Sequence, residues 1–204
     1  MIPSKSILDH LSLDPVLKKL IDTCQLKTRI GQPTVYEALL RSINFQQLSG
    51  ASATAIHNRF LDLFPDHDPQ PAHLINFSLD ELRSVGLSRQ KAQYVQNAAW
   101  FFIENQLMDA DWENLPDEEI IDMLTQIKGV GRWTVEMILM FTLDRPDVLP
   151  LDDLVVKTAM IELYEVKDLK GKALNQRLLK IAEPWRPYRS VASRYLWQWR
   201  DTIL

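Results

Sequence analysis

The segment over residues 124–135, which reads Leu-Thr-Gln-Ile-Lys-Gly-Val-Gly-Arg-Trp-Thr-Val, limits the fold of this chain more than any other feature. An apolar helical run ends in a turn that contains Gly129 and Gly131, and a second helical run begins at once. The glycines leave backbone N–H groups uncovered where the second helix presents the positive end of its dipole, which suits a phosphate oxygen. Taken alone, a Gly-x-Gly turn also joins helices that bind nothing. The segment therefore predicts a helical hairpin, with a phosphate grip as one of two interpretations.

Helical periodicity continues through almost the whole chain, and no segment alternates as a strand would. Ser78 and Ser88 are typical helix caps, and Pro116 opens an acidic first turn that leads into the hairpin. The apolar spacing predicts further helices over residues 35–48, 51–64, 134–143, 154–164, 172–182 and from 188 to the end. The predicted fold class is therefore all-α.

A proline-containing loop over residues 144–150 separates two groups of helices, because prolines remove backbone donors and favour extended geometry before them. We expect a single domain over residues 1–204 with two helical lobes. Lobe A spans approximately residues 33–144 and contains the hairpin at 124–135, and lobe B combines approximately residues 1–32 with residues 150–204.

The composition fits one globular protein of 204 residues, of which 46% are hydrophobic and 25% charged. The single cysteine, Cys24, excludes an internal disulfide and a cysteine-ligated iron–sulfur cluster, and the four histidines lack metal-ligand spacing. No apolar run is long enough to cross a bilayer, so we expect an intracellular protein without membrane contact. The net charge of −4 argues against a nucleic-acid partner, but residues 167–200 are rich in Lys and Arg and can form a local basic face.

Two carboxylates, Asp152 and Asp153, stand directly before the helical run that begins at Leu154. Aspartate is a favoured helix cap, so one interpretation is that both residues only cap this helix. The alternative is a reactive carboxylate, because a phosphate grip followed by an acid is typical of enzymes that act on DNA.

Four motifs occur in an order that resembles one known family. They are residues 42–49 (Ser-Ile-Asn-Phe-Gln-Gln-Leu-Ser), 129–134 (Gly-Val-Gly-Arg-Trp-Thr), 149–153 (Leu-Pro-Leu-Asp-Asp) and 185–190 (Trp-Arg-Pro-Tyr-Arg-Ser). From about Asp14 to Arg200 the chain is similar to the helix-hairpin-helix DNA glycosylases, and among them to the DNA-3-methyladenine glycosylase II family in its compact form without an N-terminal α/β domain. The resemblance implies base flipping into an active-site cleft between the lobes, double-stranded DNA with alkylated bases as partner, a monomer, and no required cofactor.

The resemblance assigns catalysis to Asp153. Asp152 is the alternative in a shifted register, and otherwise a helix cap or a structural ligand. A carboxylate suits the chemistry, because an alkylated purine carries positive charge and leaves readily while the sugar becomes oxocarbenium-like in the transition state. An anion beside the sugar stabilises that charge, and it can orient or deprotonate the attacking water.

Trp133 occupies the position at which relatives that also cleave the DNA backbone carry a lysine nucleophile. Without that amine no Schiff base forms there, so the resemblance implies simple hydrolysis. Trp133 and Trp197 are expected to line the base pocket, where aromatic faces attract a cationic base. Met137 replaces a pocket tyrosine of some members, which leaves the substrate range open. The alternative for Trp133 is an ordinary core tryptophan, the role also expected for Trp185.

The resemblance also assigns DNA contacts. Gln46 and Gln47 are candidates for the wedge that fills the gap left by the flipped base, with Gln47 aligned to the wedge position; the alternative is two exposed polar residues at a helix end. The amides of Gly129 and Gly131 would bind phosphate. A Na⁺ or K⁺ ion would be held by the backbone carbonyls of Thr125, Ile127 and Val130. The helix start at residues 88–91 is a candidate second phosphate contact, which an ordinary capped surface helix explains equally well.

These features predict a monofunctional glycosylase that removes alkylated purines such as 3-methyladenine and 7-methylguanine in base excision repair, in a bacterial cytoplasm or nucleoid or in a eukaryotic nucleus. A non-catalytic lesion-binding protein of the same fold is the first alternative. The others are a glycosylase for deaminated or etheno bases, and a helical scaffold with a coincidental glycine turn.

Overall fold

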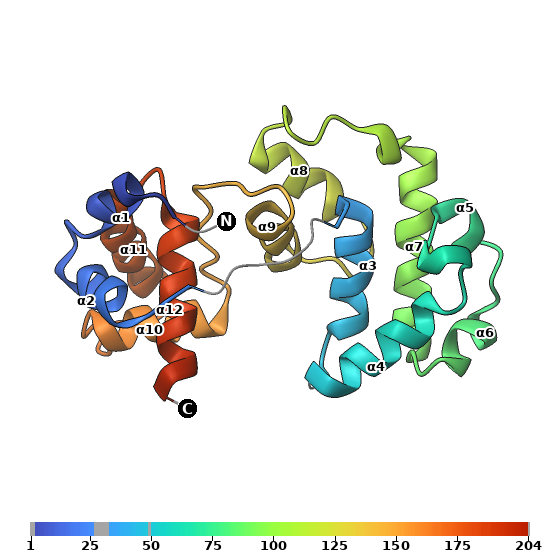
Figure 1. Cartoon of the computed structure of the whole chain (residues 1–204), viewed down its shortest axis with the longest axis horizontal. Coiled ribbons are helices and arrows are strands. Elements are labelled where there is room, and N and C mark those ends of the chain that lie inside the picture. Colours follow the sequence, from blue (N-terminus) through green and yellow to red (C-terminus); the bar gives the residue numbers. More distant parts are fainter. Residues whose placement is uncertain (1–2, 27–32, 49, 204) are drawn as a thin grey trace. The chain divides into compact units, whose positions relative to one another are not determined.

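The computed structural model describes residues 3–26, 33–48 and 50–203, and within these ranges the chain is helical and contains no strand (Figure 1). The all-α prediction is confirmed. The chain divides into two compact units: unit 1 comprises Met1–Gly31 and Leu139–Leu204, and unit 2 comprises Gln32–Ile138. The division falls inside helix α9 (Arg132–Phe141), whereas the predicted lobes change over residues 144–150. The other predicted boundary, at residues 32 and 33, borders a stretch outside the described residues.

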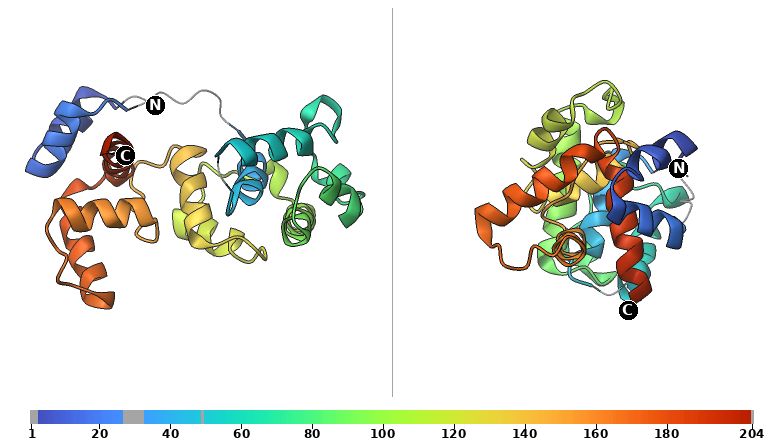
Figure 2. Two further views of the ribbon diagram at one scale, coloured as in Figure 1. Left: turned by 90° about the horizontal axis from the view of Figure 1, so that it is seen from below. Right: turned by 90° about the vertical axis from the view of Figure 1, so that its left-hand side faces the viewer.

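Unit 2 contains most of α9 and the elements α3 (Val35–Phe45), α4 (Gly50–Leu61), η1 (Pro65–His67), α5 (Pro71–Leu74), α6 (Leu79–Ser84), α7 (Arg89–Glu104), η2 (Leu107–Asp109) and α8 (Asp117–Leu124). The long helix α7 is its centre, and α3, α5 and α6 pack against it (Figure 2). Buried alanines such as Ala98 and Ala99 let the neighbouring helices approach α7 closely. The serines Ser78 and Ser88 cap α6 and α7, as the sequence predicted.

Unit 1 contains the last residues of α9 and the elements α1 (Lys5–Leu11), α2 (Pro15–Thr23), α10 (Leu154–Leu163), α11 (Gly171–Ala182), η3 (Glu183–Trp185) and α12 (Arg189–Ile203). Helix α12 packs against α10 and α2. One apolar core, which includes Leu17, Met160 and Leu196, joins these helices. The helix expected from residue 188 is therefore the element on which α2 and α10 are assembled.

Asp14 connects the N-terminal helices of unit 1 with the C-terminal ones. Its Oδ1 caps α2 by accepting hydrogen bonds from the amides of Val16 and Leu17 at 2.8 and 3.2 Å. Its Oδ2 accepts from the Tyr164 hydroxyl at 2.8 Å and from Trp185 Nε1 at 3.0 Å. Trp185 is buried, which confirms its predicted place in the core. This carboxylate is therefore structural, because both of its oxygens hold elements of the unit together.

Helix ends near the candidate site differ from the sequence prediction. Helix α3 ends at Phe45 rather than near residue 48, because Gln46 leaves helical geometry at φ −52°, ψ 132° and Gln47 follows with a left-handed φ of +56°. The helices α1, α2 and α5 were not among the predicted ranges. Among the described helices, none combines the length and the apolar character that a bilayer crossing requires.

Candidate active site and DNA-binding elements

The predicted hairpin is present in unit 2 as α8, a turn over residues 125–131, and α9. Gly129 has a φ of +100°, and a Cβ placed on it would lie 2.2 Å from Cδ2 of the Tyr94 ring. Only glycine fits this position, because any other residue would combine backbone strain with a clash. A Cβ on Gly131 would meet no atom within 4 Å, so this glycine is not required by packing within the chain.

The turn leaves its amides open. In the described part of the chain, the N–H groups of Gly129 and Gly131 have no acceptor, and they precede the first turn of α9. Arg132 is directed elsewhere: its guanidinium binds Glu118 of α8 through two nitrogens at 2.6 and 3.0 Å, and Glu136 at 3.1 Å. The hydrogen bond to Glu118 raises the pKa of Arg132, and the same bond lowers the pKa of Glu118. Arg132 therefore links the two hairpin helices. The groups that the turn offers to a ligand are its backbone amides.

The segment after α3 contacts this turn. Gln46 is half-buried, and its Nε2 donates to the Gly129 carbonyl at 3.0 Å. Gln47 is exposed, and its left-handed backbone turns it out of the α3 helix. The two glutamines, which the sequence treats as a pair, thus lie in different environments. Ser49, the last residue of their motif, lies outside the described residues.

A buried polar network supports this segment, and the sequence did not reveal it. Asn44 Nδ2 lies 3.0 Å from His57 Nδ1, and Lys91 Nζ donates to the Asn44 carbonyl at 2.9 Å. Burial, assisted by the nearby charge of Arg41, lowers the pKa of His57 to about 4. Burial also lowers the pKa of Lys91. His57 is therefore neutral near pH 7 and serves as a structural hydrogen-bonding group at the end of α3.

Lys91 therefore points inward. Arg89 and Lys128, together with Gln90, Gln93 and Tyr94, line an open groove of about 370 Å³ beside the hairpin turn. Both cations are exposed. Of the predicted helix start at residues 88–91, Arg89 is the cation that faces this groove.

Asp153 caps α10 in unit 1. Its Oδ1 accepts from the Val156 amide at 2.8 Å and from Trp197 Nε1 at 2.9 Å, and the residue is only 8% exposed. Asp152 is exposed. The expectation that Asp152 is the cap is wrong: because α10 begins at Leu154, the residue directly before it is the one whose carboxylate reaches the third amide of the helix.

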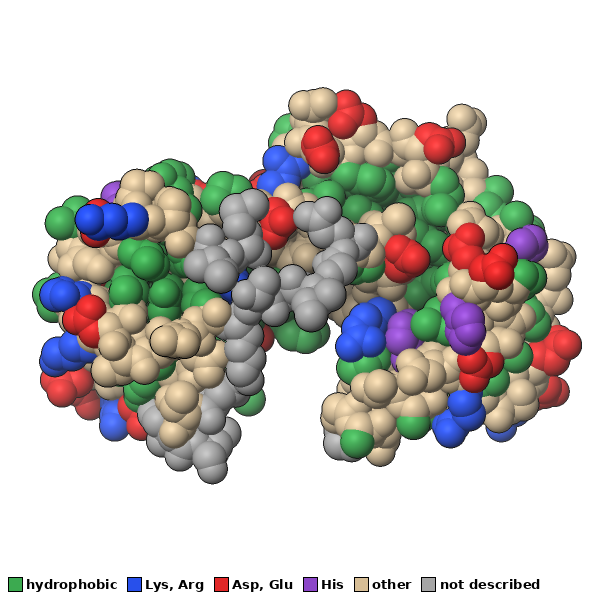
Figure 3. Space-filling view, viewed as in Figure 1, with side chains coloured by type: hydrophobic (Ala, Val, Ile, Leu, Met, Phe, Trp, Pro, Cys, Tyr) green, Lys and Arg blue, Asp and Glu red, His purple; other side chains and the backbone are tan. Residues whose placement is uncertain are grey.

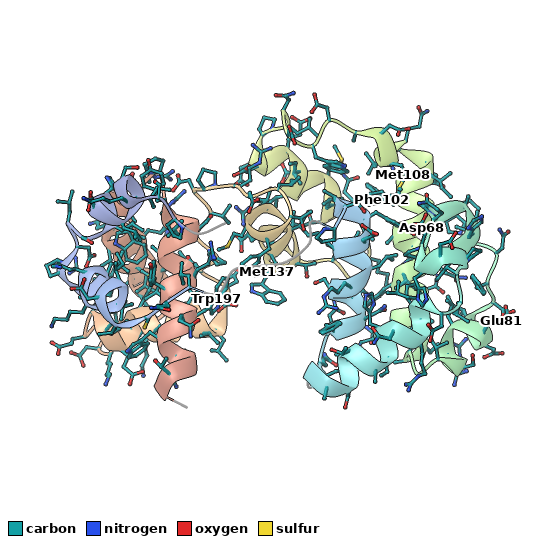
Figure 4. The ribbon with its side chains drawn as sticks, in the orientation of Figure 1. Asp68, Glu81, Phe102, Met108, Met137 and Trp197 are labelled. Carbon is teal, nitrogen blue, oxygen red and sulfur yellow. The ribbon has the colours of Figure 1, made fainter. Side chains whose placement is uncertain are left out.

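Trp197, labelled in Figure 4, lies on α12, where it contacts Asp153 and also stacks on Phe141, with ring centroids 5.5 Å apart. In unit 2, Trp133 is 41% exposed in the first turn of α9, and Met137 lies partly exposed further along the same helix. An exposure of this size does not fit the alternative in which Trp133 is a core residue. The structure thus brings Asp153 and Trp197 together within one unit, and the pocket predicted across both units remains a prediction.

The loop before Asp153 is fixed to the start of α12. Asp147 accepts from Arg189 Nε at 2.6 Å and Nη2 at 3.0 Å, and it also binds Arg186. The Ser190 hydroxyl donates to the Arg145 carbonyl at 2.7 Å. The sequence had singled out residues 185–190 as a motif but gave no role to Asp147, since an acid in a proline-rich loop has no distinguishing pattern.

These ion pairs reduce the basic face expected over residues 167–200. Arg186 and Arg189 pair with Asp147, and Arg200 pairs with Glu162. On the side of unit 1 drawn in Figure 3, basic and acidic side chains stand beside one another. Less positive charge is therefore available to a ligand than the composition suggests.

Comparison with known proteins places the chain in a family. Residues 40–184 match the family model described as HhH-GPD superfamily base excision DNA repair protein. The chain is 34% identical to the alkylbase DNA glycosidase-like protein mag2 of Schizosaccharomyces pombe, over 89% of this chain and 85% of that protein. Two solved structures are also similar. One is the 3-methyladenine DNA glycosylase Mag1 of S. pombe in complex with abasic DNA, at 33% identity and a TM-score of 0.78 over 95% of each chain.

The other is the DNA-3-methyladenine glycosidase of Bacillus halodurans, at 32% identity and a TM-score of 0.81 over 98% of this chain and 91% of that one. The chain spans most of the length of each of these proteins. The family model, the sequence relatives and the similar structures agree, and this chain belongs to the HhH-GPD superfamily of base excision DNA repair proteins.

Proposed function

We propose that this protein is a monofunctional DNA glycosylase that hydrolyses the N-glycosidic bond of alkylated purines, such as 3-methyladenine and 7-methylguanine, in double-stranded DNA. Its similarity to proteins named as 3-methyladenine glycosylases supports the substrate class. The observation that carries the proposal is Asp153, a buried carboxylate whose Oδ1 is held by the Val156 amide and by Trp197 Nε1. Such an enzyme would act where the genome is, in a nucleoid or a nucleus.

Asp153 would act on the sugar of the flipped nucleotide. Loss of the positively charged base leaves an oxocarbenium-like sugar, which an anion held in place stabilises without reorganising during the reaction. The bonds from Val156 and Trp197 fix the carboxylate in this way. The same carboxylate can orient and deprotonate the water that attacks the sugar, so an abasic site and a free base are the products.

Trp133 supports hydrolysis without strand cleavage. It stands where a lysine nucleophile would be needed for a Schiff base, and an indole cannot supply that amine. Stacking of a base on an aromatic ring contributes roughly 1–3 kcal/mol, which helps to offset the few kcal/mol that extrusion from the duplex costs. Trp133 and Trp197 would supply this stacking, and Met137 is a further candidate for contact with the flipped base.

Unit 2 would grip the DNA around the lesion. The open amides of Gly129 and Gly131 suit a phosphate, and Arg89 and Lys128 add positive charge beside the turn. Gln47, exposed at the end of α3, would fill the gap left by the flipped base. Gln46 would contribute to DNA binding indirectly, because its hydrogen bond to the Gly129 carbonyl holds the turn.

A monovalent cation would fit the same turn without taking part in the reaction. Helix α8 ends at Leu124, so the carbonyls of Thr125 and Ile127 lie near the negative end of its dipole. The Ile127 carbonyl already accepts from the Val130 amide at 3.0 Å, but a carbonyl oxygen keeps a second lone pair. The donors would be the carbonyls of Thr125, Ile127 and Val130, and the ion would add positive charge near a bound phosphate.

An excision assay tests the proposal. The purified protein should release 3-methyladenine or 7-methylguanine from methylated duplex DNA, and Asp153→Asn should abolish release, because asparagine still caps α10 but carries no charge. Asp152→Asn is the matched control and should retain activity. Borohydride should trap no covalent adduct. Full activity of Asp153→Asn would move catalysis elsewhere, and lesion binding without any release would favour the non-catalytic alternative.

A further inference from the structure

The loop that leads to Asp153 is held at its beginning by Ser190 of α12. The Ser190 hydroxyl accepts from the Val148 amide at 2.9 Å and donates to the Arg145 carbonyl at 2.7 Å, and the Ser190 amide donates to the Pro146 carbonyl at 3.0 Å. Ser190 is buried. Ser190 thus supplies hydrogen-bond partners for three backbone groups of this loop, which lacks the regular backbone hydrogen bonds of a helix or strand.

Arg189 holds the same loop by charge. Its guanidinium contacts both carboxylate oxygens of Asp147 and donates from Nη2 to the Asp147 carbonyl at 2.8 Å. The Arg189 side chain is 13% exposed and that of Asp147 23% exposed, so water screens this pair only partly. A two-pronged arginine–carboxylate contact fixes orientation as well as distance.

Only a short, closed turn separates this anchored loop from Asp153. The Leu151 amide donates to the Leu149 carbonyl at 3.0 Å, and the Asp153 amide donates to the Pro150 carbonyl at 3.0 Å. The backbone position of Asp153 therefore follows from the position of the loop before it.

Helix α12 reaches the loop a second time, at Asp153 itself. Ser190 and Trp197 are seven residues apart, which places them two turns apart on one face of the helix, separated by about 10 Å. Ser190 anchors the start of the loop, and Trp197 anchors the carboxylate at its end. A single rigid helix thus sets the distance between the two anchoring points.

We propose that Asp147, Arg189 and Ser190 form a clamp that positions Asp153 for the reaction, so that these three are positioning residues of the glycosylase. The inference rests on the proposed role of Asp153. Hydrolysis is sensitive to such positioning, because a displacement of about 1 Å in a reacting group can cost about 100-fold in rate. The clamp would therefore act on the chemical step and not on binding of the DNA.

The test compares Ser190→Ala with Ser190→Thr. We expect Ser190→Ala to slow single-turnover excision by about 10- to 100-fold, with unchanged affinity for a duplex that contains an abasic-site analogue. Ser190→Thr keeps the hydroxyl and should restore most of the rate. A second readout is the indole N–H signal of Trp197 in NMR spectra, assigned by its loss in Trp197→Phe. This signal should move in Ser190→Ala, because the carboxylate that accepts from it moves.

Arg189→Lys provides a second variant if Ser190→Ala does not fold. Lysine keeps the charge but cannot form the two-pronged contact, so the rate should again fall without loss of affinity. Arg177→Lys, on the exposed face of α11, is the matched control and should resemble the wild type. The clamp is wrong if Ser190→Ala or Arg189→Lys excises at the wild-type rate, if affinity falls as much as rate, or if the Trp197 signal stays in place.

The wild type and Asp153→Asn, measured in the same assay, separate this inference from the proposed function. Absence of excision by the wild type would overturn the function, whereas the Trp197 signal would still report whether Ser190 holds the carboxylate.

Discussion

The two units hold their candidate functional groups in opposite ways. In unit 1, the segment that carries the carboxylate of Asp153 is held by the ion pair between Asp147 and Arg189 and by the indole of Trp197. In unit 2, the side chain of Gln46 donates a hydrogen bond to the Gly129 carbonyl of the hairpin turn, and among the described residues the turn's glycine amides have no acceptor. Unit 1 thus fixes one side chain, whereas unit 2 presents backbone donors.

The difference predicts that the two units control different steps. A carboxylate that must lie beside one sugar atom tolerates little displacement, so changes in unit 1 should lower the excision rate. A phosphate bound by amides is gripped before any chemistry occurs, so changes in unit 2 should lower DNA affinity or the stability of the unit. Four sets of variants and conditions test this division.

The largest effect is expected from Gly129→Ala. An alanine there would combine a left-handed backbone with a Cβ 2.2 Å from the Tyr94 ring, so we expect unit 2 to lose about 3 kcal/mol or more of unfolding free energy. Urea unfolding followed by circular dichroism measures the loss.

Gly131→Ala is the matched control, because its Cβ would meet no atom of the chain within 4 Å. Its unfolding free energy should change by less than about 1 kcal/mol. If its DNA affinity nevertheless falls, a phosphate approaches this glycine closely. Equal stability losses in the two variants would contradict the role given to Tyr94.

Acid should destabilise unit 2 through His57. Its pKa is about 4 in the folded protein against 6.5 for a free histidine, so below pH 6.5 the unfolded chain takes up a proton that the folded chain does not. The stabilisation is complete above pH 6.5 and is lost progressively down to about pH 4, by roughly 3 kcal/mol in total. Unfolding free energies measured across this range report the loss.

The comparison variant is His57→Gln, which should be less stable at pH 7 but should lose less stability between pH 6.5 and 4. His73→Gln, at an exposed position, should follow the wild type. If His57→Gln and the wild type lose the same stability with acid, carboxylates elsewhere account for the pH dependence.

The sequence predicted what depends on local pattern. The hairpin, the caps at Ser78 and Ser88 and most helix ranges follow from residues close together in the chain, and the structure has them. The family resemblance supplied the candidates Asp153, Trp133 and Trp197. Local preference could not decide which of two adjacent aspartates caps α10, because a shift of one residue in the helix start exchanges their roles.

Besides the helices α1, α2 and α5, the parts that the sequence missed are contacts between distant residues. Asp147 and Arg189 are 42 positions apart, and Asn44 and His57 are 13 apart across a turn. Such pairs leave no periodic trace in the sequence, and their formation depends on how the helices pack. Gln46 is a related case, since the motif named it as a candidate DNA contact and only the fold shows that its side chain donates to the hairpin turn.

An intermediate effect is expected from Trp197→Phe. The change keeps a ring against Phe141 but removes the N–H that donates to Asp153. A hydrogen bond to a charged group contributes about 1.5–3 kcal/mol, so single-turnover excision should slow by about 10- to 100-fold while DNA affinity stays the same. Trp199→Phe on the same helix is the control. A loss confined to affinity would place Trp197 in DNA binding and break the division between the units.

The smallest effect is expected from Gln46→Ala. The variant loses one neutral hydrogen bond to the Gly129 carbonyl, worth about 0.5–1.5 kcal/mol, so duplex affinity should fall by about two- to tenfold. The rate at saturating enzyme should not change, because Asp153 belongs to the other unit. Gln47→Ala is the useful contrast, since Gln47 is exposed and should support base extrusion rather than the hairpin. If Gln46→Ala instead slows excision with full affinity, the hairpin acts on the chemical step as well, and binding and catalysis cannot be assigned to separate units.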